Sequence, residues 1–190
     1  MKKSLIIIPV IYLLSGCQTI MMGALGIKQP LIQSNYAIQK YATKHFTGYT
    51  LFRVDSLAMS SLLHQVYKPN WEPGFRPVQF ICFAPDGKII TQWASCEGNL
   101  NRTLSTFPPK SEFPGDSSKS FSGITENVHP ILKSSPTLAL NKTHYTYIVY
   151  WAIWTGRQST ELVDELEEYV KKNGGDKNDI LLVNTDIYKS

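Results

Sequence analysis

The C-terminal part of the chain carries the pattern that most restricts its fold: a strand, a helix and a second strand in succession. Residues 145–154, "YTYIVYWAIW", are aromatic and β-branched, which favours a buried strand. Residues 158–172 repeat apolar side chains at helical spacing, and residues 179–187 return to a strand pattern. Such a unit predicts two parallel strands joined by a right-handed crossover. We therefore expect an α/β fold.

A second pattern, "VQFICFAPDGKIITQWA" over residues 78–94, predicts an antiparallel hairpin. Asp86-Gly87 forms its turn, because this pair tolerates the positive backbone angles that tight hairpin turns require. Both faces of the first hairpin strand are largely apolar. We therefore expect that strand inside the sheet, with a covering layer on each side.

The rest of the chain predicts several shorter elements and one long irregular region. The expected elements are a helix over 35–46, a strand over 49–54, a helix over 55–67 and a short helix over 96–107. Residues 108–143 are an insertion rich in Pro, Ser, Thr and Gly, with weak periodicity, which is unusual inside a compact domain. We interpret this insertion as a surface excursion. The alternatives are a small helix at about 124–133 or a flap.

The N-terminus has the features of an export signal. Lys2 and Lys3 precede an apolar run, residues 5–14, that is too short to span a bilayer and is typical of a secretion signal. The following "LSGC" ends at Cys17 and resembles the lipobox of bacterial lipoproteins. The alternative is an ordinary secreted protein in which this cysteine occurs by chance.

The lipobox resemblance implies a domain organisation and a location. It implies cleavage before Cys17 and acylation of the sulfur and the amine of that residue, so that acyl chains hold the protein on a membrane. The chain then divides into a signal peptide over 1–16, a lipid-anchored tether over 17–32 and a single domain over 33–190. The implied location is the bacterial cell envelope, in the outer membrane and facing the periplasm.

Composition and motifs exclude several classes of function. The formal net charge is +4, to which the signal-peptide residues Lys2 and Lys3 contribute, and no basic run or aromatic–basic stripe indicates a nucleic-acid partner. The chain has no His-Glu-x-x-His, no phosphate-binding glycine loop and no Gly-x-Ser-x-Gly, and its four histidines lack metal-ligand spacing. We expect no metal and no cofactor. The expected partners are the membrane, through the lipid anchor, and a protein, peptide or small-molecule ligand.

Residues 147–187 resemble the central strand–helix–strand unit of thioredoxin-like proteins, in which Trp-Ala-x-Trp precedes Cys-Gly-x-Cys at the helix start. Trp151, Ala152, Trp154 and Gly156 match this pattern. Pro77 and the hairpin resemble the end of the same fold, but here they precede the redox unit, whereas the family places them after it. We interpret this order as a circular permutation.

The resemblance implies a three-layer sandwich around a central mixed sheet of about five strands. The predicted strand order is 49–54, 179–187, 145–154, 78–84 and 88–94, with the first and last strands at the edges. A generic α/β sandwich is the alternative.

The redox chemistry that the resemblance implies is missing from the sequence. Thr155 and Gln158 stand at the two cysteine positions, and neither side chain can form a thiolate. Val149 stands where the family often carries a carboxylate that assists proton transfer. Thiol–disulfide exchange at this turn is therefore excluded. Thr155 is expected to cap the helix and Gly156 to form the tight turn.

The turn is nevertheless the candidate binding site, because a helix N-terminus flanked by aromatic and basic side chains can bind anions and carbonyl groups. The candidate residues are Pro77, Trp151, Trp154, Thr155, Gly156, Arg157 and Gln158. The alternative is that the tryptophans belong to the core and that Arg157 is solvated.

The two remaining cysteines, Cys82 and Cys96, are not expected to form a disulfide. The hairpin turn places residue 82 opposite about residue 91, so Cys96 lies about five residues further on, or ~17 Å at ~3.4 Å per residue. Bridged α-carbons are usually within ~7 Å. Cys82 is expected to be a small core residue. Cys96 precedes a predicted helix, where a thiol can be acidified.

Three functional hypotheses follow. The first is a lipid-anchored envelope protein with a redox-inactive thioredoxin-like domain that acts as a binding or assembly module. The second is a thiol redox enzyme that uses Cys96 alone, and the third is a structural subunit of an envelope complex. We favour the first, with no catalytic residue and with Cys17 as the site of lipid attachment.

Overall fold

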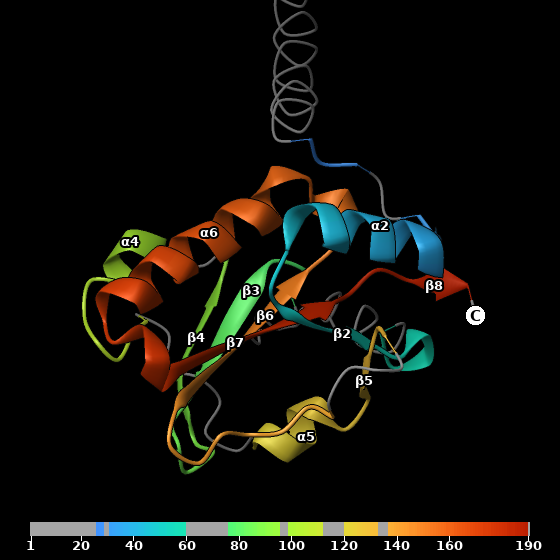
Figure 1. Ribbon diagram of the computed structural model, residues 1–190. Coiled ribbons are helices and arrows are strands. Elements are labelled where there is room, and N and C mark those ends of the chain that lie inside the picture. Colours follow the sequence, from blue (N-terminus) through green and yellow to red (C-terminus); the bar gives the residue numbers. More distant parts are fainter. Residues whose placement is uncertain are drawn as a thin grey trace, which may run out of the picture.

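The computed structural model describes residues 26–28, 31–59, 76–95, 99–111, 120–132 and 137–189. Within these residues the chain forms a mixed α/β fold around a six-stranded sheet of order β4-β3-β6-β7-β2-β5 (Figure 1). The strands are β2 (Thr50–Val54), β3 (Gln79–Phe83), β4 (Ile89–Ala94), β5 (Val128–Pro130), β6 (Tyr145–Trp151) and β7 (Asn178–Asn184). The predicted order of the five other strands is therefore confirmed, and β5 is an addition.

The strand–helix–strand unit at the C-terminal end forms as predicted. β6 and β7 are parallel neighbours over their whole length, from Tyr145 opposite Asn178 to Trp151 opposite Asn184. Between them α6 (Arg157–Lys172) buries one apolar stripe and ends next to Gly174, whose positive φ of 91° suits a glycine. The short helix η2 (Gly175–Lys177) then leads into β7.

The hairpin also forms as predicted. β3 pairs antiparallel with β4 on one side and with β6 on the other. Gly87 has φ 84°, and the Asp86 carboxylate accepts the Lys88 N–H at 3.1 Å. All five residues of β3 are buried, because helices or loops cover both faces of this strand.

The described residues of the irregular region between the hairpin and β6 contain more regular structure than the sequence predicts. The alternative of a small helix at about 124–133 is wrong: α5 (Phe121–Thr125) ends early and β5 follows it, antiparallel to β2. The reason is that β5 satisfies the outer backbone edge of β2. Beyond the strand pairing, two backbone hydrogen bonds join these segments: Asp55 N–H donates to Asn127 O, and Ile131 N–H donates to Leu51 O. β2 is therefore not the edge strand that we expected, and this segment is more than a surface excursion.

One other helix is shorter than predicted, a second can be compared only at its start, and one small sheet was not predicted. The helix expected over 96–107 is α4 (Leu100–Thr103), started by the Asn99 side chain. The helix expected over 55–67 begins at residue 56, and its part beyond residue 59 lies outside the described residues. β1 (Gln33–Ser34) pairs in parallel with β8 (Tyr188–Lys189), which ties the two ends of the domain together.

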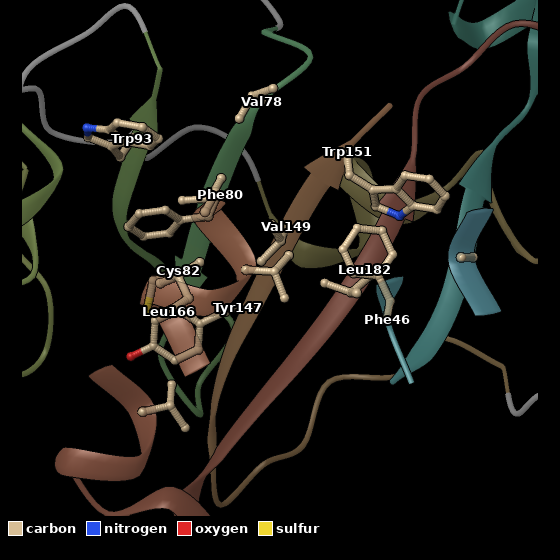
Figure 2. Close-up of a cluster of buried hydrophobic side chains, with 14 of the residues drawn as sticks. Phe46, Val78, Phe80, Cys82, Trp93, Tyr147, Val149, Trp151, Leu166 and Leu182 are labelled. Atoms are coloured by element: carbon tan, nitrogen blue, oxygen red, sulfur yellow. The ribbon is translucent and has the colours of Figure 1, made fainter. Parts of the chain in front are cut away.

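The core consists of two clusters, one on each face of the sheet. α2 (Asn35–His45) and α6 cover one face, while α5 and residues 58–59 cover the other (Figure 1). The larger cluster runs along β3 and β6 and contains Trp151 and Phe46 at one end, with Cys82 and Leu166 at the other (Figure 2). This arrangement gives the three layers that we expected and places the end of β6 beneath α2.

Candidate functional site

The candidate turn joins the end of β6 to α6 through a short helix, η1 (Ile153–Thr155). Gly156 occupies the position before α6 with φ 60° and ψ −133°, a conformation that disfavours other residues. The expected role of Gly156 in the tight turn is therefore confirmed.

Thr155 does not cap α6, so that prediction is wrong. Its side chain is buried and points back to the strand end, where the hydroxyl donates to Ala152 O at 2.6 Å. The same oxygen lies 2.5 Å from the hydroxyl of Ser159, which accepts the Ala152 N–H at 3.3 Å. Two hydroxyl groups thus hold the turn together, and one of them, that of Thr155, stands at the position of the first cysteine in the thioredoxin-like pattern.

α6 begins without a side-chain cap, and the first-turn residue Arg157 is exposed. Arg157 Nε lies 3.7 Å from Glu161 Oε1, and the side chain remains 64 % exposed. A helix start without such a cap can accept a carbonyl or carboxylate oxygen from a ligand, and the positive end of the helix dipole favours negative charge there.

The two tryptophans of the turn have different environments. Trp151 is fully buried, stacked on Tyr41 with 5.7 Å between ring centroids and edge-to-face with Phe46 at 4.9 Å (Figure 2). Trp154 is half-buried, and its carbonyl accepts the backbone N–H of Lys28 at 2.7 Å. Trp151 is therefore a core residue, while Trp154 lies at the surface of the candidate site.

Pro77 and Gln158 complete the set of predicted site residues, and both are half-buried. β3 runs antiparallel to β6, and their pairing ends with Gln79 opposite Tyr150. Pro77 precedes this last pair by two residues.

The N-terminal segment also reaches the turn. Besides the Lys28 bond to Trp154, a β-carbon built on Gly26 would lie 3.7 Å from Gly156 Cα. The backbone of residues 26–28 therefore lies directly against the turn. Part of the surface that a ligand could use is already taken by the chain itself.

Sequence reasoning missed a buried polar group beside the turn, at the end of β7. Asn184, Thr185 and Asp186 are all buried. Asp186 Oδ2 accepts the Ile153 N–H and the Asn184 side-chain amide, both at 2.8 Å, while Oδ1 has no hydrogen-bond partner within the described residues. The available signal was the polar triplet Asn-Thr-Asp after an apolar strand.

The environment of Asp186 raises the pKa of its carboxyl group. Burial away from water is the largest cause, and the hydrogen bonds from Asn184 and from the backbone of Ile153 and Trp154 oppose it. The charge of Asp186 in turn contributes, after burial, to a raised pKa of Tyr41, whose hydroxyl donates to Gly156 O at 3.4 Å. The carboxylate therefore influences the turn electrostatically without being exposed to a ligand.

The sulfur chemistry of the described residues is inert. Cys82 is a free, buried thiol opposite Thr91, as the hairpin register predicts, and burial raises its pKa to about 12. Cys17, the predicted lipid attachment site, and Cys96, the candidate reactive thiol, both lie outside the described residues.

A pocket of about 440 Å³ lies at the opposite end of the strands from the turn, near the start of β2 and β7 and the end of α6. Glu167 reaches into this region and accepts bonds from the Tyr49 hydroxyl at 2.9 Å and the Lys171 amine at 2.7 Å. Because opposite charges and a hydroxyl satisfy one another here, the pocket offers no free charged group from these three residues.

Comparisons with protein-family models, with curated proteins and with solved structures find no match for this chain. In the part of the chain that the structure describes, no helix has both the length and the apolar character needed to cross a bilayer. Among the same residues, no three His, Cys, Asp or Glu side chains are grouped so as to hold a metal ion.

Proposed function

We propose that this protein is a lipid-anchored protein of the bacterial cell envelope, and that its thioredoxin-like, redox-inactive domain binds a partner at the start of α6. The strand order supports the thioredoxin-like part of the proposal, because it follows from assuming a permuted sheet. The antiparallel pairing of β3 with both β4 and β6, shortly after Pro77, supports it as well. β5 is then an extra strand added to that sheet.

The start of α6 is the observation that carries the binding role. A sixteen-residue helix begins there without a side-chain cap, next to the exposed Arg157. Thr155 and Asp186 are buried and bond to the turn, so neither side chain is accessible to a substrate. Such a site suits a carbonyl- or carboxylate-bearing partner, for example an extended peptide, better than it suits catalysis.

The binding role can be tested by photocrosslinking in intact host cells. A photoreactive amino acid at Arg157 should give a discrete covalent adduct, because this position borders the site. The same amino acid at Glu168, exposed on the outer face of α6, should not give that adduct. Equal adducts from both positions, or none from Arg157, would contradict a partner at the start of α6.

The membrane anchor is tested separately. Expressed in a bacterial host, the protein should partition into the detergent phase, whereas a Cys17→Ser variant should stay in the aqueous phase, because acyl chains contribute about 0.8 kcal/mol per buried methylene. A Cys17→Ser variant that still enters the detergent phase would rule out lipidation at this residue.

A further inference from the structure

The charges of the chain are distributed unevenly along it. Between Cys17 and Val54 the sequence contains Lys28, Lys40, Lys44 and Arg53 and no Asp or Glu; the first acidic residue is Asp55. All fifteen acidic residues lie in the remainder of the chain. The segment nearest to the N-terminus is therefore purely cationic.

Helix α2 presents part of this charge on one outward stripe. Its inner face buries Ile38 and Ala42 against the core. Tyr36, Lys40 and Lys44 are exposed and spaced four residues apart, so they lie on one outer face of the helix. The Lys40 amine lies 6.0 Å from the centre of the Tyr36 ring.

Two large apolar side chains are exposed shortly before α2 in the chain. Leu31 and Ile32 are 64 % and 67 % exposed, and Tyr36 is 71 % exposed. The next residues are held in place, because Gln33 N–H donates to Ile187 O at 2.7 Å and β1 pairs with β8. We call Leu31, Ile32, Tyr36, Lys40 and Lys44 the α2 surface.

We propose that the α2 surface lies on an anionic phospholipid bilayer. Leucine, isoleucine and tyrosine side chains suit the boundary between acyl chains and headgroups, and lysine amines can extend from there to lipid phosphates. An acid-free surface that combines both kinds of side chain complements a negatively charged lipid surface. This inference goes beyond the proposed function and does not require lipidation of Cys17.

The neighbouring helix limits how the domain can lie. The outer face of α6 carries the exposed residues Glu161, Asp164, Glu165 and Glu168, which an anionic bilayer repels. α2 and α6 cover the same side of the sheet (Figure 1). The domain must therefore tilt so that α2 and the Leu31–Ile32 edge approach the lipid while the acidic face of α6 turns away.

The course of the chain agrees with this orientation. Residues 26–28 lie against the turn at the start of α6, on the side of the domain that α2 covers (Figure 1). Gly26 lies nine residue steps after Cys17, and such a stretch spans at most about 32 Å. A membrane attachment at Cys17 would therefore keep the α2 surface close to the bilayer.

The test uses the chain from residue 17 onward with Cys17→Ser, so that no acyl chain contributes, and vesicles of phosphatidylcholine with or without about one-third phosphatidylglycerol. Binding is measured by co-sedimentation, and folding is checked by circular dichroism. We expect binding to the anionic vesicles only, weakening as salt is added. Each lysine near an anionic surface contributes roughly a fivefold factor to the partition of the protein onto vesicles. Lys40→Glu with Lys44→Glu should therefore reduce the partition coefficient at least about thirtyfold.

Two further variants distinguish binding through the α2 surface from an effect of the net charge alone. Lys142→Glu with Lys177→Glu changes the net charge equally at two exposed positions before β6 and β7, and should bind nearly as the parent does. Leu31→Ser with Ile32→Ser should weaken binding without changing the net charge. Equal binding to both vesicle types, or equal losses in the two charge variants, would overturn the proposal.

Discussion

At the scale of single residues, the carboxyl group of Asp186 is the most unusual feature of the turn. One of its oxygens accepts two hydrogen bonds, while the other is buried without a partner among the described residues. A buried carboxylate is costly when charged, and burial raises the pKa of Asp186 accordingly. Asp186 therefore binds its proton more tightly in the folded state than in the unfolded state.

The sign of the pH effect follows from this difference. The contribution of Asp186 to stability is fully present below its unfolded pKa and is lost as pH rises through its higher folded pKa. We predict that Asp186→Asn, which keeps one acceptor oxygen, gains stability relative to the parent as pH rises from about 3.5 to 7. Urea unfolding across this range measures it. A difference in unfolding free energy between variant and parent that stays constant with pH would contradict a raised pKa of Asp186.

Thr155 provides a second prediction at this scale. Thr155→Val removes a buried hydroxyl that donates to Ala152 O and contacts Ser159, so unfolding should become easier by about 1–3 kcal/mol. Thr155→Ser keeps the hydroxyl and should cost clearly less. Chemical denaturation of both variants measures the difference, and equal losses would mean that the hydroxyl contributes no more to stability than the methyl group does.

These two residues also show what the sequence could predict at the turn. The absence of sulfur and the tight glycine were visible in residues 155–158, because they depend only on residue type. The direction of the Thr155 side chain was not visible, since it depends on Ser159 one helical turn later. Asp186 was missed because its contact with Ile153 joins the segment after β7 to the short helix η1, which are distant in sequence.

At the scale of elements, Trp151 connects β6 to α2. Its ring is fully buried between Tyr41 and Phe46 (Figure 2). We predict that Trp151→Ala costs about 3–5 kcal/mol, because the loss of apolar contact adds to the cavity left behind. Trp154→Ala is the matched control at a half-buried position and should cost much less. Thermal and urea unfolding compare the two variants.

The regular elements were predictable where hydrophobic periodicity or turn chemistry is strong. β6, α6 and β7 follow from their spacing, and the hairpin follows from Asp86-Gly87. β5 was not predictable, because the edge of β2 that it covers becomes apparent only when the sheet is assembled. A three-residue strand after a five-residue helix leaves almost no periodic signal in the sequence.

At the scale of the whole molecule, the predicted strand order was the most specific prediction, because it fixed the neighbours of five strands at once. It followed from matching short motifs and assuming a different starting point in the chain, and five strands agree with it. The pairing of β1 with β8 was not foreseen, because two-residue strands carry no pattern of their own. This pairing closes the N-terminal segment onto the C-terminal end of the domain, which places the α2 surface and the turn on one side.

The last prediction tests the thioredoxin-like character of the whole arrangement. A disulfide between two cysteines that are separated by two residues at a helix start, as in Cys-x-x-Cys, requires a particular turn shape. The helix N-terminus then lowers the pKa of the first thiol. We predict that Thr155→Cys with Gln158→Cys, made together with Cys82→Ser and Cys96→Ser, forms an intramolecular disulfide that dithiothreitol reverses.

The same variant should reduce insulin disulfides measurably, while the parent should not, because its turn lacks a thiol. Thr155→Cys alone, in the same background, is the control for a thiol without a resolving partner. A folded protein that carries both new cysteines and fails to form the disulfide would contradict a thioredoxin-like turn. Reductase activity in the parent that is lost only in its Cys96→Ser variant would favour the single-thiol enzyme over the binding module.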